Sequence, residues 1–193
     1  KTFTVPYKVI FIYLVLQLLT EVFSRIYSYY FLSNLIFINI GNIIELLCIY
    51  GFLKASSNNF HKIRHLLFSV VLFYNVYEIF TLDYQDFASF QTYSRSVNCV
   101  FLLIITIYKI INNLKKEVIH KSVNVKLSLI LFFTVGAILN LPINLLVNNN
   151  NLMVYSFWLI HMINYNILYT VLINYLRNFN KTKNVEKIEL IQS

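Results

Sequence analysis

The sequence predicts an all-α fold, a polytopic transmembrane helix bundle with six spans. Of the 193 residues, 58% are hydrophobic and only 12% are charged, whereas soluble domains carry about 25% charged residues. Three glycines and two prolines are too few for a turn-rich all-β fold. This composition excludes a disordered chain, a secreted disulfide scaffold and an ordinary soluble enzyme.

A membrane-spanning helix requires about 20 mostly apolar residues. The segments that meet this requirement are residues 6–30, 31–54, 63–83, 94–114, 127–148 and 152–177. They lack the alternating polarity of outer-membrane β-strands, and helices are the other way to satisfy backbone polar groups in hydrocarbon. We therefore predict one helical bundle over residues 1–178 and a short cytoplasmic tail over residues 179–193.

Polar breaks separate the predicted spans. The first break, around Ser33 and Asn34, is weak and predicts a tight connection. Residues 54–64 and 115–126 form basic loops, residues 83–91 form an acidic loop, and residues 148–151 form an asparagine turn. Within span five, Pro142 removes a backbone donor and favours a kink.

The distribution of Lys and Arg predicts the orientation. With the 54–64 loop in the cytoplasm, alternation of the spans leaves only Arg25 and Arg95 on the outer side. The inner side holds Lys1, Lys8, Lys54, Lys62, Arg64, Lys109, Lys115, Lys116, Lys121, Lys126, Arg177, Lys181, Lys183 and Lys187. This positive-inside bias predicts a bacterial inner (cytoplasmic) membrane protein with both termini of the chain in the cytoplasm. The net charge of +8 then indicates anionic membrane lipids as partners and not nucleic acid.

Several polar side chains fall in the outer half of the predicted spans, where unpaired ionisable groups are costly. They are Glu21, Arg25, Glu78, Arg95, Asn98, Asn140, Asn144, His161 and Tyr165. If they face inward, they line an outward-facing polar pocket that binds a ligand. The alternatives are an i,i+4 ion pair for Glu21 and Arg25, helix-end anchoring for Glu78 and Arg95, and interhelical hydrogen bonding for the asparagines and His161.

Glu45 is predicted to lie in the inner half of span two, one turn from Asn42. Lys109 of span four is the basic residue expected at its depth. A dry carboxyl group favours the protonated form, so Glu45 is a candidate proton-linked group. The alternative is a hydrogen bond to a neighbouring helix.

Motifs for established chemistries are missing from the sequence. It contains no GxSxG, HExxH, P-loop or CxxC pattern. Cys48 and Cys99 fall at opposite predicted depths, too far apart for a disulfide. His61 and His65 have i,i+4 spacing but lie in a basic loop without a carboxylate, which disfavours a metal. We therefore predict no catalytic residue, no metal and no cofactor.

Short motifs in the first two spans and at the start of the last span resemble a known group of membrane proteins. Residues 18–24 (LLTEVFS) and 39–47 (NIGNIIELL), each with a glutamate, and Phe157-Trp158 resemble small uncharacterised polytopic membrane proteins of Bacteroidota. The resemblance implies no activity. It implies a further apolar helix ahead of this segment, which would give the intact gene product seven spans.

These observations favour a non-enzymatic role, as a membrane-embedded sensor or as an accessory subunit of a larger complex. The loops are too short for a catalytic or signalling domain, so other membrane protein subunits are the expected partners. One alternative is a small transporter or channel subunit, with a water path from the outer polar groups to Glu45. Another is a lipid-directed membrane enzyme that uses Glu21, Glu78 and His161 for acid–base chemistry.

Overall fold

The computed structural model shows an all-helical chain. It describes residues 5–31, 35–55, 62–81, 93–114, 123–146 and 151–192. The helices are α1 (Val5–Phe31), α2 (Leu35–Ala55), α3 (Lys62–Thr81), α4 (Ser94–Leu114), α5 (Val123–Leu146) and α6 (Asn151–Gln192). All six are long and apolar enough to cross a membrane. The prediction of a six-span all-α bundle is confirmed.

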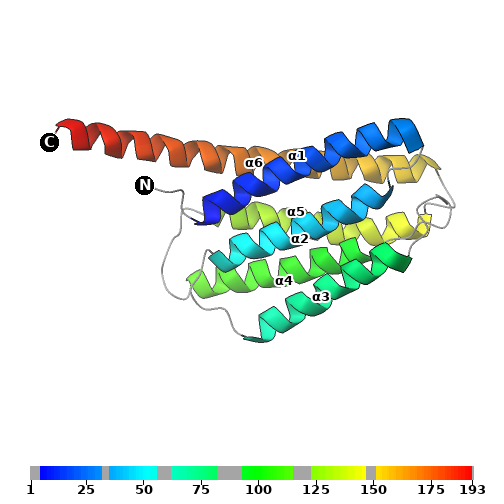
Figure 1. Cartoon of the computed structure of the whole chain (residues 1–193). Coiled ribbons are helices and arrows are strands. Elements are labelled where there is room, and N and C mark those ends of the chain that lie inside the picture. Colours follow the sequence, from blue (N-terminus) through cyan, green and yellow to red (C-terminus); the bar gives the residue numbers. More distant parts are fainter. Residues whose placement is uncertain are drawn as a thin grey trace.

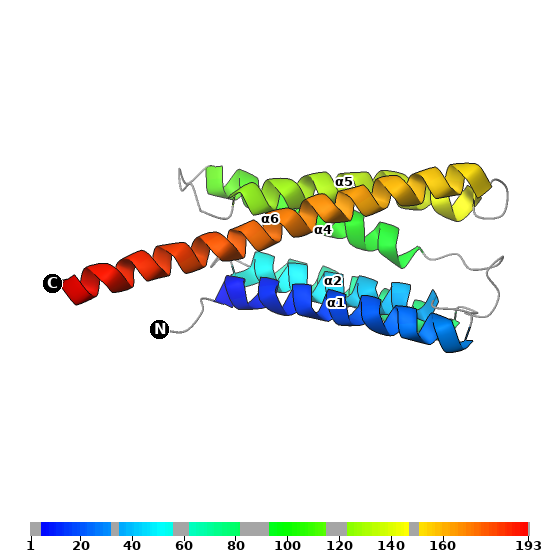
Figure 2. The ribbon, with the colours of Figure 1, turned by 90° about the horizontal axis from the view of Figure 1, so that it is seen from above.

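Five of the helices surround a common interior (Figures 1 and 2). The contacts run in the cyclic order α1, α2, α4, α5, α6 and back to α1, while α3 packs on the outside against α2 and α4. Apolar side chains such as Leu46, Leu102, Phe133 and Leu172 are fully buried in this interior. α3 is attached at one end by the hydroxyl group of Tyr50, which lies 3.0 Å from Nδ1 of His65.

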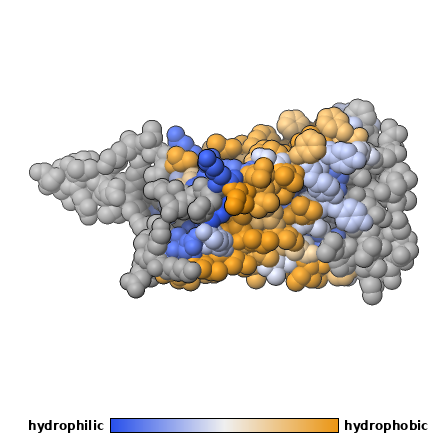
Figure 3. Space-filling view, turned by 90° about the horizontal axis from the view of Figure 1, so that it is seen from below, coloured by the Kyte–Doolittle hydropathy of each residue, from blue (hydrophilic) through white to orange (hydrophobic). Residues whose placement is uncertain are grey.

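The outer surface of the bundle carries many large apolar side chains. Large side chains such as Leu18, Phe73, Leu131 and Met162 point away from the interior and are exposed. Figure 3 shows the resulting hydrophobic band across the middle of one face, bordered on both sides by more polar surface. An exposed apolar belt of this kind is expected where lipid replaces water as the solvent. The chain is therefore an integral membrane protein.

The two ends of the bundle differ in charge. One end contains the start of α1, α3 and α5 and the end of α2 and α4. We call it the basic end, because it carries Lys8, Lys54, Lys62, Arg64, Lys109, Lys126 and Arg177. At the opposite end, the far end, the cations among the described residues are Arg25 and Arg95. The segregation of cations that the sequence predicts is thus present in the folded chain.

α6 is much longer than one span. Its apolar segment ends at Asn178, but the helix continues unbroken to Gln192 and projects beyond the bundle at the basic end (Figure 1). The 179–193 segment predicted as a tail is therefore largely a continuation of the last spanning helix. The reason is local, because no proline or glycine follows Asn178 to end the helix.

α4 and α5 approach closely at Gly136. A Cβ atom at this position would lie 2.8 Å from Sγ of Cys99, which is too close for ordinary packing. We expect Gly136→Ala to lower the free energy of unfolding by about 1–3 kcal/mol, the cost typical of overpacking. Denaturation of the purified protein in detergent measures the change.

Gly51→Ala is the matched control for Gly136→Ala. The nearest atom to an added Cβ at position 51 is Cγ1 of Val9, at an ordinary 3.6 Å, so this variant should retain wild-type stability. Adding Cys99→Ala to Gly136→Ala should recover most of the loss, because it removes the clashing sulfur. Equal effects of the two glycine substitutions would show that the close approach is not what matters.

Candidate functional site

The interior holds a chain of polar contacts between three helices. Tyr165 of α6 donates a hydrogen bond from its hydroxyl group to Oε2 of Glu45 on α2, at 3.0 Å. The same hydroxyl oxygen accepts a hydrogen bond from Nη2 of Arg95 on α4. Tyr165 therefore connects a carboxylate and a guanidinium group inside the bundle. We call Glu45, Arg95, Tyr165 and the neighbouring His161 the interior polar site.

The position of α4 explains how Arg95 reaches this site. α4 begins at Ser94, and Figure 2 shows its first turn set back from the far ends of α1, α5 and α6. A side chain from the second residue of α4 can therefore extend to the middle of α6. Glu45 is 4% exposed, whereas Arg95 is half-buried. Nε of Arg95 is itself buried, so the exposed surface of this residue lies elsewhere along its length, and the site is closed around the carboxylate.

This arrangement differs from the predicted depths. Glu45 was expected at the inner level with Lys109, apart from the outer groups. In the structure it lies beside Tyr165 and within electrostatic range of Arg95, while Lys109 belongs to the basic end. The difference arises because residue counting along each helix assumes that all helices start at the same level.

His161 is the least satisfied polar group of the site. Its side chain is 2% exposed, and neither ring nitrogen has a hydrogen-bond partner among the described residues. The ring lies 5.0 Å from the ring of Tyr165, centroid to centroid, and within electrostatic range of Arg95. Nε of Arg95 is also buried, with no hydrogen-bond partner in the part of the chain that the structure describes. Each unsatisfied buried polar atom costs about 1–3 kcal/mol, so adjacent ones indicate a place where a small polar molecule would gain hydrogen bonds.

Two further tyrosines complete the surroundings and were not among the predicted site residues. Tyr13 of α1 is fully buried, and its ring lies 6.4 Å from that of Tyr169 on α6. Both tyrosines are within electrostatic range of Glu45. Their positions in the sequence could have identified them. Tyrosines of membrane proteins are expected at the ends of spans, whereas these two lie well inside their spans.

Asn98 and Asn75 serve to hold helices together. Their side-chain amides donate to each other's oxygens, with N–O distances of 2.8 and 2.9 Å, and both residues are buried. Nδ2 of Asn98 also donates to the carbonyl oxygen of Asn42, at 3.3 Å. These contacts join α2, α3 and α4, which is the interhelical role weighed for Asn98 from the sequence.

We expect Asn98→Leu to lower the free energy of unfolding by about 1–2 kcal/mol, because Oδ1 of Asn75 and the carbonyl oxygen of Asn42 lose the amide group that donates to them. Asn166→Leu is the matched control. Among the described residues, the Asn166 amide donates to the carbonyl oxygen of Met162 on its own helix, and Asn166 is exposed. The comparison is made by denaturation in detergent, and equal losses in the two variants would contradict an interhelical role.

Asn140 and Asn164 also make contacts between helices. Nδ2 of Asn140 lies 3.7 Å from Sγ of Cys99, and Nδ2 of Asn164 donates to the carbonyl oxygen of Phe132 at 3.0 Å. Asn140 thus borders the interior polar site on the α5 side. The side chain of Asn144 lies outside the described residues. α5 continues as a helix through Pro142.

Glu78 does not face a ligand pocket, because its carboxylate contacts the backbone at the start of α4. Its Oε1 accepts hydrogen bonds from the backbone N–H groups of Tyr93 at 2.7 Å and Ser94 at 3.2 Å, and its Oε2 accepts one from Ser94 at 3.1 Å. The first N–H groups of a helix lack partners within the helix and favour a negative charge. Glu78 of α3 therefore caps the start of α4. The capped residue Ser94 directly precedes Arg95 in the sequence.

Glu21 and Arg25 do not join the interior polar site. Nε of Arg25 donates to Oε1 of Glu21 at 3.0 Å, and their side chains are 63% and 79% exposed for Glu21 and Arg25 respectively. The pair forms the i,i+4 contact weighed from the sequence, on the outer surface of α1. Since His161 is buried, the structure does not bring Glu21 to His161 as an acid–base set would require.

The remaining site predictions concern metals and cysteines. The described part of the chain contains no group of three or more His, Cys, Asp or Glu side chains able to hold a metal ion. Cys48 and Cys99 are free. His65 lies in α3, where it contacts Tyr50, and His61 lies outside the described residues.

Comparison with known proteins adds no assignment. No family model matches the chain, and no curated protein or solved structure matches it. The function has to be inferred from the geometry of the interior polar site and of α6.

Proposed function

We propose that this integral membrane protein is a non-enzymatic sensor, in which the interior polar site receives a signal and α6 transmits it to a partner subunit. One observation carries the proposal. Tyr165, which links Glu45 to Arg95, belongs to the helix that projects from the basic end. The same continuous helix therefore contains the centre of the site and the part of the chain best placed to meet a partner.

The site offers hydrogen-bond groups to a small polar ligand that enters from the far end. His161 and Nε of Arg95 have unused hydrogen-bonding capacity, and Arg95 lies near the far end in a half-buried position. Protonation of Glu45 is a second way to change the site, because a neutral carboxyl group pairs less well with Arg95. Either event alters the contacts that α6 makes through Tyr165, and such differential contacts are what shift a conformational equilibrium.

The projecting helix provides the output. From Asn178 to Gln192, α6 extends about 21 Å beyond its spanning segment, at 1.5 Å per residue. The excess of cations at the basic end supports a cytoplasmic location for it in a bacterial inner membrane. An accessory subunit of a larger membrane complex would use this helix as its contact.

Copurification from native membranes tests the proposal, with the full chain tagged at its N-terminus. We expect a membrane protein partner to be retained by the wild type and to be lost or depleted with Tyr165→Phe. Tyr155→Phe is the matched control, because Tyr155 lies on the same helix but is 74% exposed, and it should retain the partner. A wild-type chain purified without a partner, or equal retention by the two variants, would contradict the proposed role.

A further inference from the structure

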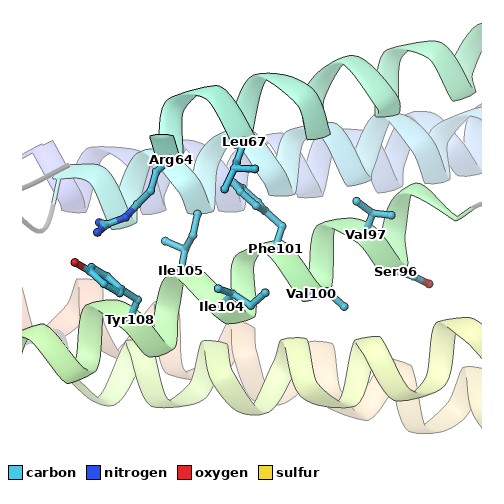
Figure 4. A pocket seen from close by; sticks show the side chains of 9 residues that line it. All are labelled: Arg64, Leu67, Ser96, Val97, Val100, Phe101, Ile104, Ile105 and Tyr108. Carbon is cyan, nitrogen blue, oxygen red and sulfur yellow. The ribbon is translucent and has the colours of Figure 1, made fainter. Parts of the chain in front are cut away.

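A long apolar groove lies on the outer surface between α3 and α4. Its volume is about 620 Å³. Figure 4 shows Leu67 of α3 and Phe101 of α4 projecting into the space between the two helices, with Arg64 and Tyr108 together at one end. The end with Arg64 is the basic end of the bundle.

The dimensions of the groove match one leaflet of a membrane. From Ser96 to Tyr108 its lining follows α4 for about 18 Å, at 1.5 Å per residue. The hydrocarbon core of a bilayer is about 30 Å thick, so the groove extends over somewhat more than half of it. Its apolar walls, with Val100 and Ile104 among them, suit an acyl chain.

The basic end of the groove carries concentrated positive charge. The guanidinium carbon of Arg64 lies 3.8 Å from the centre of the Tyr108 ring, which holds this half-buried side chain at the groove mouth. Lys109 of α4 is within electrostatic range of both Arg64 and Lys126 of α5. Lys126 is fully buried, and its Nζ has no hydrogen-bond partner among the described residues.

We propose that the groove binds an anionic glycerophospholipid from the leaflet at the basic end, with one acyl chain along α4 and the phosphate group at Arg64. Lys109 and Lys126 strengthen the positive potential behind Arg64 without contacting the lipid. An anionic phosphate group is attracted by this positive potential. A zwitterionic lipid supplies a compensating cation of its own and is therefore the poorer occupant.

Photo-crosslinking of the full chain in phosphatidylcholine nanodiscs tests the site. The probe is a phosphatidylglycerol that carries a photoreactive group in one acyl chain. We expect crosslinks on α3 and α4, and stronger competition by unlabelled phosphatidylglycerol than by added phosphatidylcholine. Arg64→Gln should reduce the crosslinking about fivefold, the effect expected for one cation near an anionic lipid, whereas Arg64→Lys should retain most of it.

Two variants separate binding from folding. Lys62→Gln removes a cation from an exposed position on the same helix and should leave crosslinking unchanged. Ile104→Trp fills the groove from a residue that is already exposed, so it should block crosslinking in a folded protein. Equal competition by the two lipids, or undiminished crosslinking in both Arg64→Gln and Ile104→Trp, would overturn the proposal. Disulfide formation between two copies through Ile104→Cys would also overturn it, by showing that a second chain fills the groove.

Discussion

Replacing Glu45 by alanine is expected to lower the free energy of unfolding by about 3 kcal/mol. The substitution removes the acceptor for the Tyr165 hydroxyl group and leaves Arg95 inside the bundle without a compensating carboxylate. Removal of one partner from a buried charge pair typically costs about 3–5 kcal/mol, and the half-buried position of Arg95 places the expected loss at the lower end. Denaturation in detergent or mixed micelles measures it.

A second substitution distinguishes an unpaired charge from a simple cavity. In the double variant Glu45→Leu with Arg95→Met, both charges are absent and apolar side chains fill the space. This variant should be more stable than Glu45→Leu alone, because replacement of both partners avoids the buried unpaired charge. If the losses of the two single variants instead add in the double variant, Glu45 and Arg95 are not coupled through Tyr165.

Replacing Glu78 by leucine is expected to cost about 3 kcal/mol as well, for a different reason. The carboxylate accepts three hydrogen bonds from the backbone N–H groups of Tyr93 and Ser94 at the start of α4. Leucine leaves these N–H groups unsatisfied, at about 1–3 kcal/mol for each buried group, and removes a negative charge from a helix N-terminus. Since Arg95 is the next residue, we also expect α4 to fray at the interior polar site.

Glu78→Gln is the control for this prediction. Glutamine keeps an acceptor oxygen and loses only the charge, so the expected cost is about 1 kcal/mol. Hydrogen exchange at the amides of the first turn of α4 should increase strongly in Glu78→Leu and only slightly in Glu78→Gln. Unchanged exchange in Glu78→Leu would show that the cap does not hold the helix start.

The spans were predictable because the membrane imposes a length and an apolar composition on each of them. The predicted 94–114 segment coincides with α4 (Ser94–Leu114). The 31–54 segment starts four residues before α2 (Leu35–Ala55), since only Ser33 and Asn34 mark the break. The separation of cations to one end followed from the same pattern of loops.

The facing of the polar side chains was not predictable in the same way. Most of the spans have no strong amphipathic periodicity, so the pattern does not distinguish their interior face from their lipid-facing surface. α4 is the exception, because its polar side chains, Asn98 among them, gather on the buried face. The rule that polar groups face inward holds for Asn98 and His161, which are buried. It fails for Glu21 and Arg25, because an ion pair within one helix satisfies both groups without a neighbouring helix.

Which residues meet in the interior polar site depends on how far neighbouring helices are displaced along their axes. The sequence of a single span does not determine this displacement. Arg95 meets Tyr165 because α4 starts deeper than its neighbours (Figure 2). Tyr13 lies beside the site because α1 packs against both α2 and α6. Such relations between helices come from packing, whereas the sequence reports only distances along each helix.

The coupling of the interior polar site to α6 is the central claim, and a distance measurement tests it most directly. Spin labels at Arg177→Cys on α6 and Leu114→Cys on α4, both exposed at the basic end, would be introduced after Cys48 and Cys99 are replaced by alanine. Double electron–electron resonance spectroscopy then gives the distribution of distances between the two spin labels. We predict that Tyr165→Phe shifts or broadens this distribution, while Tyr155→Phe leaves it as in the parent protein. The same distribution in all three proteins would contradict the claim that the site controls the position of α6.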